Sequence, residues 1–217
     1  MAYMVESAWD AAVTPEDAYR RYALGVAGPE AADDLLAALH GIEEITDAAK
    51  GLRGLGFMWS SLHRKHWQPG AQPGPAWQEP VARLAPIEQR LECALEHAVA
   101  QGRRLVRNYL SFVRFAGLFL RTLDLIRQAR AAYDQAQEKW QARDPVAYHP
   151  LMVRSSDLLS AALEASERAL RTWADQVADP TGLGTLAGLN AYGHDRLRGK
   201  CTEVYWESCC YGSSHLG

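Results

Sequence analysis

The sequence predicts an all-α fold: a helical bundle with one long central helix and an irregular C-terminal tail. Apolar residues recur at intervals of three and four from Pro15 to about Val177, the spacing of helices that each bury one face. Alternating runs of Val, Ile or Thr, which would indicate strands, are few. Pro and Gly separate the periodic stretches, so we expect several distinct helices.

The first two predicted helices are short. Thr14 can cap a helix that begins at Pro15, with acidic residues next to the positive end of its dipole, and this helix should run to about Leu24. After Gly28, Pro29 opens a second helix. Its apolar face carries Leu35, Leu36, Leu39, Ile42, Ile45 and Ala49.

Residues 69–80 are rich in Pro and Gly and predict a loop. A helical stripe follows, and Gly102 marks a break or kink after it. The stripe consists of Leu84, Ile87, Leu91, Ala94, Leu95 and Ala98.

The longest helical pattern runs from Arg103 to Arg143, and its first half is apolar enough for a central, largely buried helix. Asp144 and Pro145 end it, and a further helix reaches about Val177 before residues 179–182 stop it. The segment after Arg198 lacks helical periodicity. We therefore expect a helical bundle domain over residues 1–198 and a Cys-containing C-terminal tail over residues 199–217.

Composition limits the classes of function. The formal charge of −3 argues against general binding of nucleic acid, and no stretch approaches 18 uncharged apolar residues, so we expect no membrane partner. The first residues lack the basic and apolar regions of a signal peptide, so we expect a cytoplasmic protein. No glycine-rich phosphate loop follows a strand, Gly-x-Ser-x-Gly does not occur, and we assign no catalytic residue.

An aromatic and histidine segment is the first candidate site. Trp59, His63, His66 and Trp67 would share one face of a helix. This face either packs against the bundle or forms a surface for a partner or a sugar, whose C–H faces pack on aromatic rings. A metal site is a third interpretation, although the Glu-x-x-His spacing of bundle metal sites is absent.

A cysteine and histidine cluster near the C-terminus is the second candidate. Cys201, Cys209, Cys210 and His215 are the ligand types that zinc prefers, but their spacing matches no zinc knuckle. The cluster therefore belongs either to a poorly packed tail, to a metal or thiol centre, or to a processed segment. We expect no cofactor, with zinc as the alternative if the cluster binds metal.

Arginines recur every seven residues at Arg107, Arg114 and Arg121, with Arg103 one turn earlier. They form either a solvated, ion-paired face or a surface for phosphate or an acidic partner.

Two segments resemble a known accessory domain. Residues 8–23, AWDAAVTPEDAYRRYA, with GPEAA at 28–32, are similar to the junction that follows the barrel in many glycoside hydrolases. Residues 179–192, DPTGLGTLAGLNAY, resemble the segment that closes their helical domain. The resemblance is to the C-terminal helical domains of barrel glycosidases, including α-glucuronidases and hexosaminidase-like enzymes. The catalytic barrel and its carboxylates are missing from this chain.

The resemblance implies a non-catalytic module that packs on a catalytic partner, associates with itself, or borders a glycan-binding cleft. If it contacts sugar, Asn190 and Tyr192 join Trp59, His63, His66 and Trp67 as candidates. Two alternatives are a metal- or thiol-dependent protein that uses the C-terminal cluster, and a bundle that binds nucleic acid or an acidic partner through the arginines. Within an enzyme, the chain would be part of a glycoside hydrolase.

Overall fold

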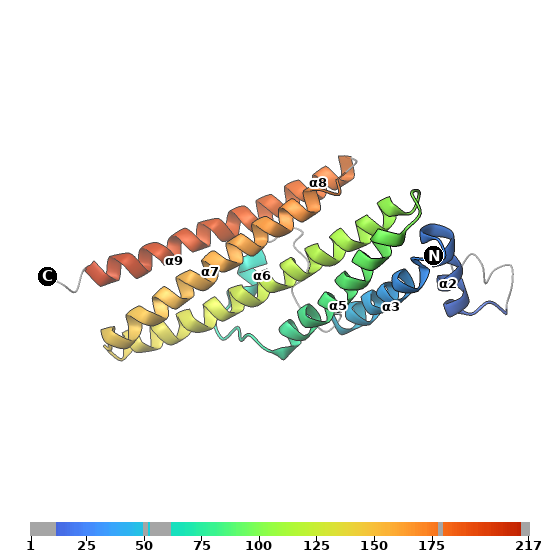
Figure 1. The fold of residues 1–217 in the computed structure, drawn as a ribbon. Helices are drawn as coiled ribbons and strands as arrows, with labels where there is room; N and C mark the ends of the chain where they lie inside the picture. Colours follow the sequence, from blue (N-terminus) through green and yellow to red (C-terminus); the bar gives the residue numbers. More distant parts are fainter. Residues whose placement is uncertain (1–11, 50–51, 53–61, 178–179, 214–217) are drawn as a thin grey trace. The chain divides into compact units, whose positions relative to one another are not determined.

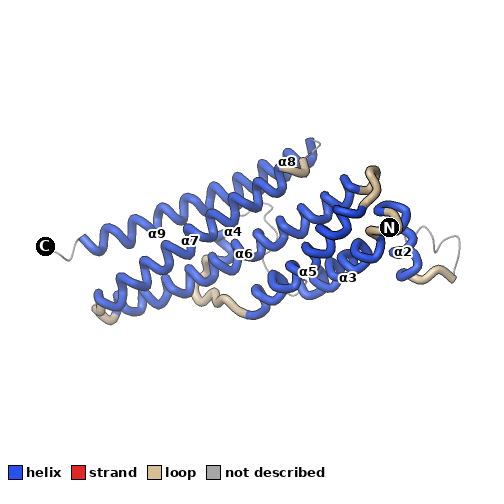
Figure 2. Tube along the Cα trace, viewed as in Figure 1, coloured by secondary structure: helices blue, strands red, loops and turns tan. Residues whose placement is uncertain are grey.

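The computed structural model describes residues 12–49, 52, 62–177 and 180–213, and this part of the chain forms helices without any strand (Figures 1 and 2). The predicted all-α fold with one long helix is confirmed. The chain divides into two compact units, Met1–Gly51 with Ala82–Arg114, and Leu52–Val81 with Phe115–Gly217. Helices α5 (Pro75–His97) and α6 (Arg103–Gln141) contribute residues to both units.

The first unit contains α2 (Pro15–Ala27) and α3 (Ala32–Ala49) together with parts of α5 and α6. Thr14 caps α2 as predicted, because its hydroxyl oxygen accepts from the backbone N–H of Asp17 at 3.1 Å. The Asp17 carboxylate in turn accepts from the backbone N–H of Thr14 at 3.3 Å, which completes a capping box.

The core of the first unit uses small residues where elements approach closely. Ala18, Ala23 and Ala27 of α2 are buried. Gly102, in the turn before α6, lies against the backbone of Val26, and a Cβ at this glycine would be only 2.0 Å from the Val26 carbonyl oxygen. The predicted break at Gly102 is confirmed, and this approach explains why no larger residue fits there.

The second unit contains α4 (Leu62–His66), α7 (Pro145–Ala174), α8 (Pro180–Leu189), a π-helical turn η1 (Asn190–His194) and α9 (Asp195–Ser213), with parts of α5 and α6. Helices α7 and α9 lie side by side along much of their length (Figure 1). Helix α7 also packs on α6, where the buried Ser155 hydroxyl donates to the Ala129 carbonyl oxygen at 2.9 Å. Asp144 ends one helical pattern and caps the next, accepting from the backbone N–H of Ala147 at 3.1 Å.

The structure differs from the sequence prediction in residues 69–80. Only the first part of this segment is a loop, because α5 already begins at Pro75. Proline is well suited to the first turn of a helix, since the N–H that it lacks would have no partner there. Trp77 is buried and continues the apolar stripe of Leu84, Ile87 and Leu91 at helical spacing.

The C-terminal segment also differs from the expectation of an irregular tail, because residues up to Ser213 belong to α9. The buried or half-buried face of this helix carries Leu197, Cys201, Val204 and Ser208, which follow the three–four spacing. Cys201 and Ser208 are small and weakly apolar, so the pattern does not stand out in the sequence. None of the described helices is both long enough and apolar enough to span a bilayer.

Candidate functional site

Trp67, one of the predicted sugar-binding residues, directly follows α4 and is fixed to α6 by a network of polar and aromatic contacts. The Trp67 ring lies 5.5 Å from the ring of Tyr133. The guanidinium of Arg130 lies 5.5 Å from the Trp67 ring centroid, and its Nη1 donates to the Trp67 carbonyl oxygen at 3.3 Å. Asp134 holds Arg130 in an ion pair at 2.6 Å and accepts from the backbone N–H of Gly70 at 2.9 Å. The turn around Trp67 is therefore held in one place before any ligand arrives.

A buried aromatic and cationic cluster supports this turn from α5 and α6. His66 is 1% exposed and meets the ring of Trp77 edge to face, with centroids 5.1 Å apart. The guanidinium of Arg127 lies 4.7 Å from the Trp77 ring centroid. Burial lowers the pKa of Arg127, and the nearby Asp124 opposes that shift. Because His66 is covered, it supports the position of its neighbour Trp67 and does not form part of the open surface.

Trp67 lines an open groove of about 620 Å³, within the range of about 300–1,000 Å³ typical of small-molecule sites. One wall comes from α4 and the residues that follow it, and the other comes from α9. We call this site the Trp67 groove. Its lining residues are Arg64, Trp67, Gln68, Asp195, Arg196, Gly199, Lys200 and Glu203.

Ion pairs order the α9 wall of the Trp67 groove. Asp195 accepts from Asn190 at 3.1 Å and pairs with Arg198 at 3.2 Å. Glu203 pairs with the Lys200 ammonium at 2.5 Å. The same ammonium lies 5.9 Å from the ring centroid of Trp67, so it links the two walls. The groove thus offers one aromatic ring surrounded by hydrogen-bonding and charged groups.

The structure brings together some of the predicted sugar-binding residues. Trp67 lines the groove, and Asn190 contacts it indirectly through Asp195. Tyr192 is 40% exposed on the π-helical turn and is not among the lining residues. Trp59 lies outside the described residues, as does the side chain of His63.

The predicted metal-binding residues on α9 are differently placed. Cys201 is half-buried, and its thiol donates to the carbonyl oxygen of Leu159 on α7 at 3.3 Å. Cys209 and Cys210 are exposed, and His215 lies outside the described residues. Among the residues that the structure describes, no three His, Cys, Asp or Glu side chains converge as a metal would require. A zinc site that includes His215 stays a prediction.

The arginines of the predicted stripe differ in their contacts and in their exposure. Arg114 pairs with Glu88 at 2.6 Å and with Glu92 at 2.5 Å. The Arg103 Nε donates to the carbonyl oxygen of Ala98 at 3.0 Å. Arg107 and Arg121 are exposed. The contacts of Arg114 and Arg103 favour the interpretation of an ion-paired helix face.

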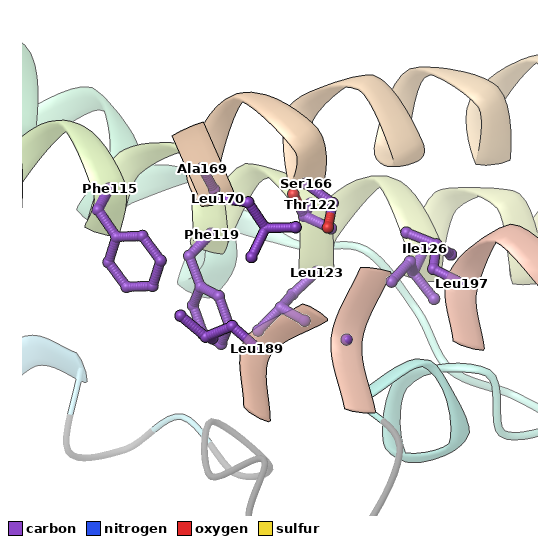
Figure 3. Close-up of a pocket in the computed structure, with 11 residues that line it drawn as sticks. Phe115, Phe119, Thr122, Leu123, Ile126, Ser166, Ala169, Leu170, Leu189 and Leu197 are labelled. Atoms are coloured by element: carbon purple, nitrogen blue, oxygen red, sulfur yellow. The ribbon is translucent and has the colours of Figure 1, made fainter. Parts of the chain in front are cut away.

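A second cavity lies inside the second unit among α6, α7, α8, η1 and α9 (Figure 3). Its volume of about 20 Å³ accommodates roughly one water molecule. Its lining is almost entirely apolar, with Phe115, Phe119 and Leu189 among the residues that face it. It is therefore too small for an organic ligand.

Most groove residues were not predicted from the sequence. Arg196, Gly199, Lys200 and Glu203 are spaced to share one face of a helix, but only once the segment is known to be helical. Nothing in one sequence shows that this face meets Arg64 and Gln68. Comparisons of the chain with protein-family models, with curated proteins and with solved structures give no match.

Proposed function

We propose that this protein is a non-catalytic helical module that binds carbohydrate in the Trp67 groove. The observation that carries the proposal is the position of Trp67 opposite the polar face of α9 in one groove. An aromatic ring packs against the C–H face of a sugar, while surrounding amides, carboxylates and cations bond its hydroxyl groups. Gln68, Asp195 and Glu203 supply such groups on both walls.

A binding role fits the groove better than hydrolysis. Glycoside hydrolysis generally uses two carboxyl groups, one of which delivers a proton to the leaving oxygen. The two carboxylates of the groove, Asp195 and Glu203, are both engaged by basic side chains, at 3.2 Å and 2.5 Å. These pairs support a role in shaping the groove wall.

A glycan array followed by calorimetric titration of the best ligands tests the proposal. Trp67→Ala should weaken binding at least about tenfold, equivalent to about 1.4 kcal/mol. Trp140→Ala is the matched control, because Trp140 is 36% exposed on α6 and does not line the groove. The proposal fails if no glycan binds, or if the two variants lose affinity equally.

Self-association is a second candidate function, supported by a different observation. Tyr205 and Trp206 are 53% and 57% exposed, and their rings lie 5.8 Å apart on α9. Tyr and Trp are residue types enriched at protein interfaces. We propose a second copy of this chain as the partner of this pair. Sedimentation analysis across a concentration series should show a dimer that Trp206→Ser weakens, and a concentration-independent monomer would exclude it.

A further inference from the structure

The charged residues of the Trp67 groove are not balanced. Three of its lining residues are basic, namely Arg64, Arg196 and Lys200, whereas two are acidic, namely Asp195 and Glu203. The chain as a whole carries a formal charge of −3, so this local excess of positive charge runs against the overall balance.

The acidic residues of the groove are already neutralised. Glu203 is paired with Lys200 inside the groove, at 2.5 Å. Asp195 is paired with Arg198, which does not line the groove, and also accepts from the amide of Asn190 at 3.1 Å. Neither carboxylate is therefore left to balance the remaining cations.

The cations of the groove that remain unbalanced are two guanidinium groups. Arg64 and Arg196 are exposed, and neither side chain has an ion-pair partner within the described part of the chain. They approach the groove from its two different walls, Arg64 from α4 and Arg196 from α9. A guanidinium presents a planar set of donors that matches the oxygens of a carboxylate or a sulfate.

We infer that the Trp67 groove selects a sugar that carries a negatively charged group, a carboxylate or a sulfate ester. The Trp67 ring packs on the sugar ring, and Arg64 and Arg196 bind the anionic substituent. This inference rests on the proposed carbohydrate binding and adds the class of ligand. Neutral sugars can pack on Trp67 and form hydrogen bonds through their hydroxyl groups, but they lack the ion pair with the two arginines and should bind more weakly.

Matched pairs of ligands test the charge requirement. One pair is an oligogalacturonate and its methyl ester, and the other is a sulfated carrageenan oligosaccharide and its desulfated form. Calorimetry should show that at least one charged member binds about tenfold more tightly than its neutral counterpart, and that this advantage falls as salt rises. The pair with the larger difference identifies the carboxylate or the sulfate as the preferred group.

Single substitutions test which side chains produce the preference for the charged ligand. Arg64→Gln and Arg196→Gln should each remove most of the preference for the charged ligand and leave the affinity for the neutral one nearly unchanged. Trp67→Ala should weaken both members of the pair. Arg168→Gln is the control, because Arg168 is exposed on α7 and does not line the groove.

Each outcome separates the inference from the function on which it rests. If both members of each pair bind equally and the arginine variants change nothing, carbohydrate binding stands and the anionic preference is wrong. If polyglutamate binds as tightly as the charged oligosaccharides, no sugar is required and both proposals fail. If no oligosaccharide binds at all, the proposed function itself is wrong.

Discussion

Arg130 donates a hydrogen bond to the main-chain carbonyl oxygen of Trp67 at 3.3 Å, although 63 positions separate the two residues in the sequence. The same guanidinium contacts the rings of Trp67 and Tyr133, at 5.5 Å and 5.3 Å from their centroids. One side chain of α6 thus fixes both the backbone and the ring of the residue that is central to the candidate site. Removal of this half-buried, ion-paired side chain should destabilise the folded protein, because Asp134 would lose its ion-pair partner.

Arg130→Ala should therefore loosen the turn that carries Trp67 and lower the free energy of unfolding by about 1–3 kcal/mol. Urea unfolding followed by circular dichroism measures the stability, and near-ultraviolet circular dichroism reports the packing of the tryptophans. Arg130→Lys should recover only part of the loss, since an ammonium retains the charge but not the planar set of donors. A fully stable Arg130→Ala protein with an unchanged aromatic spectrum would contradict this role.

The elements predicted correctly are those whose buried faces consist of large apolar residues. In α6, Leu110, Val113, Leu120 and Leu123 are all buried, and their spacing identifies a helix without any tertiary information. In α9 the equivalent face includes Cys201 and Ser208, which makes its helical character hard to recognise from the sequence. Tertiary contact with α7 explains why Cys201 faces inward, since its thiol bonds to the Leu159 carbonyl oxygen.

The candidate site was predictable only in part, for a related reason. Trp67 and Asn190 were identified as chemically suited to sugar, but the groove depends on contact between α4 and α9. Such long-range contacts leave no local spacing signal. The proposed preference for an anionic sugar depends on Arg64 and Arg196. Both residues belong to ordinary polar stretches of the sequence.

Two glycines in the first unit should respond in opposite directions to the same substitution. Gly102→Ala would place a Cβ 2.0 Å from the Val26 carbonyl oxygen, a backbone atom that cannot rotate away. We therefore expect the free energy of unfolding to fall by about 1–3 kcal/mol. Gly25→Ala lies within α2 and meets nothing within 4 Å, so the better helix propensity of Ala should stabilise the protein by up to about 1 kcal/mol. Thermal and urea unfolding of both variants provides the comparison. Equal effects at the two positions would refute the close approach at Gly102.

Ser155 and Ser160 on α7 form a second matched pair. Ser155 is 0% exposed and bonds across to Ala129 on α6, whereas Ser160 is exposed and bonds only within its own helix, to Ser156. Ser155→Ala should cost about 0.5–1.5 kcal/mol, because it removes a buried hydrogen bond between helices. Ser160→Ala should change the stability by less than about 0.5 kcal/mol. If denaturant titrations give the same cost for both variants, the contact between α6 and α7 at Ser155 contributes nothing.

Cys201 should be alkylated more slowly than the other cysteines of α9. Burial raises its pKa from 9.0 to about 11, because the half-buried site disfavours the charged thiolate. The thiolate is the reactive form, so in a variant that keeps Cys201 as its one thiol (Cys93→Ser, Cys209→Ser, Cys210→Ser) alkylation by iodoacetamide should accelerate up to about pH 11. A rate that levels off near pH 9 would show that the site is not protected by burial.

The same shift links Cys201 to alkaline stability. Because the pKa is raised in the folded state, the folded protein holds this proton more tightly than the unfolded chain does. The resulting stabilisation is complete below about pH 9 and is lost as the pH rises through about 11. The free energy of unfolding of Cys201→Ala should therefore fall less than that of the parent protein between these pH values. This difference does not depend on which of the two proteins is more stable at pH 7. Urea unfolding of both proteins at pH 7, 9 and 10.5 tests this difference, and parallel losses would exclude the titration of Cys201 as a source of alkaline instability.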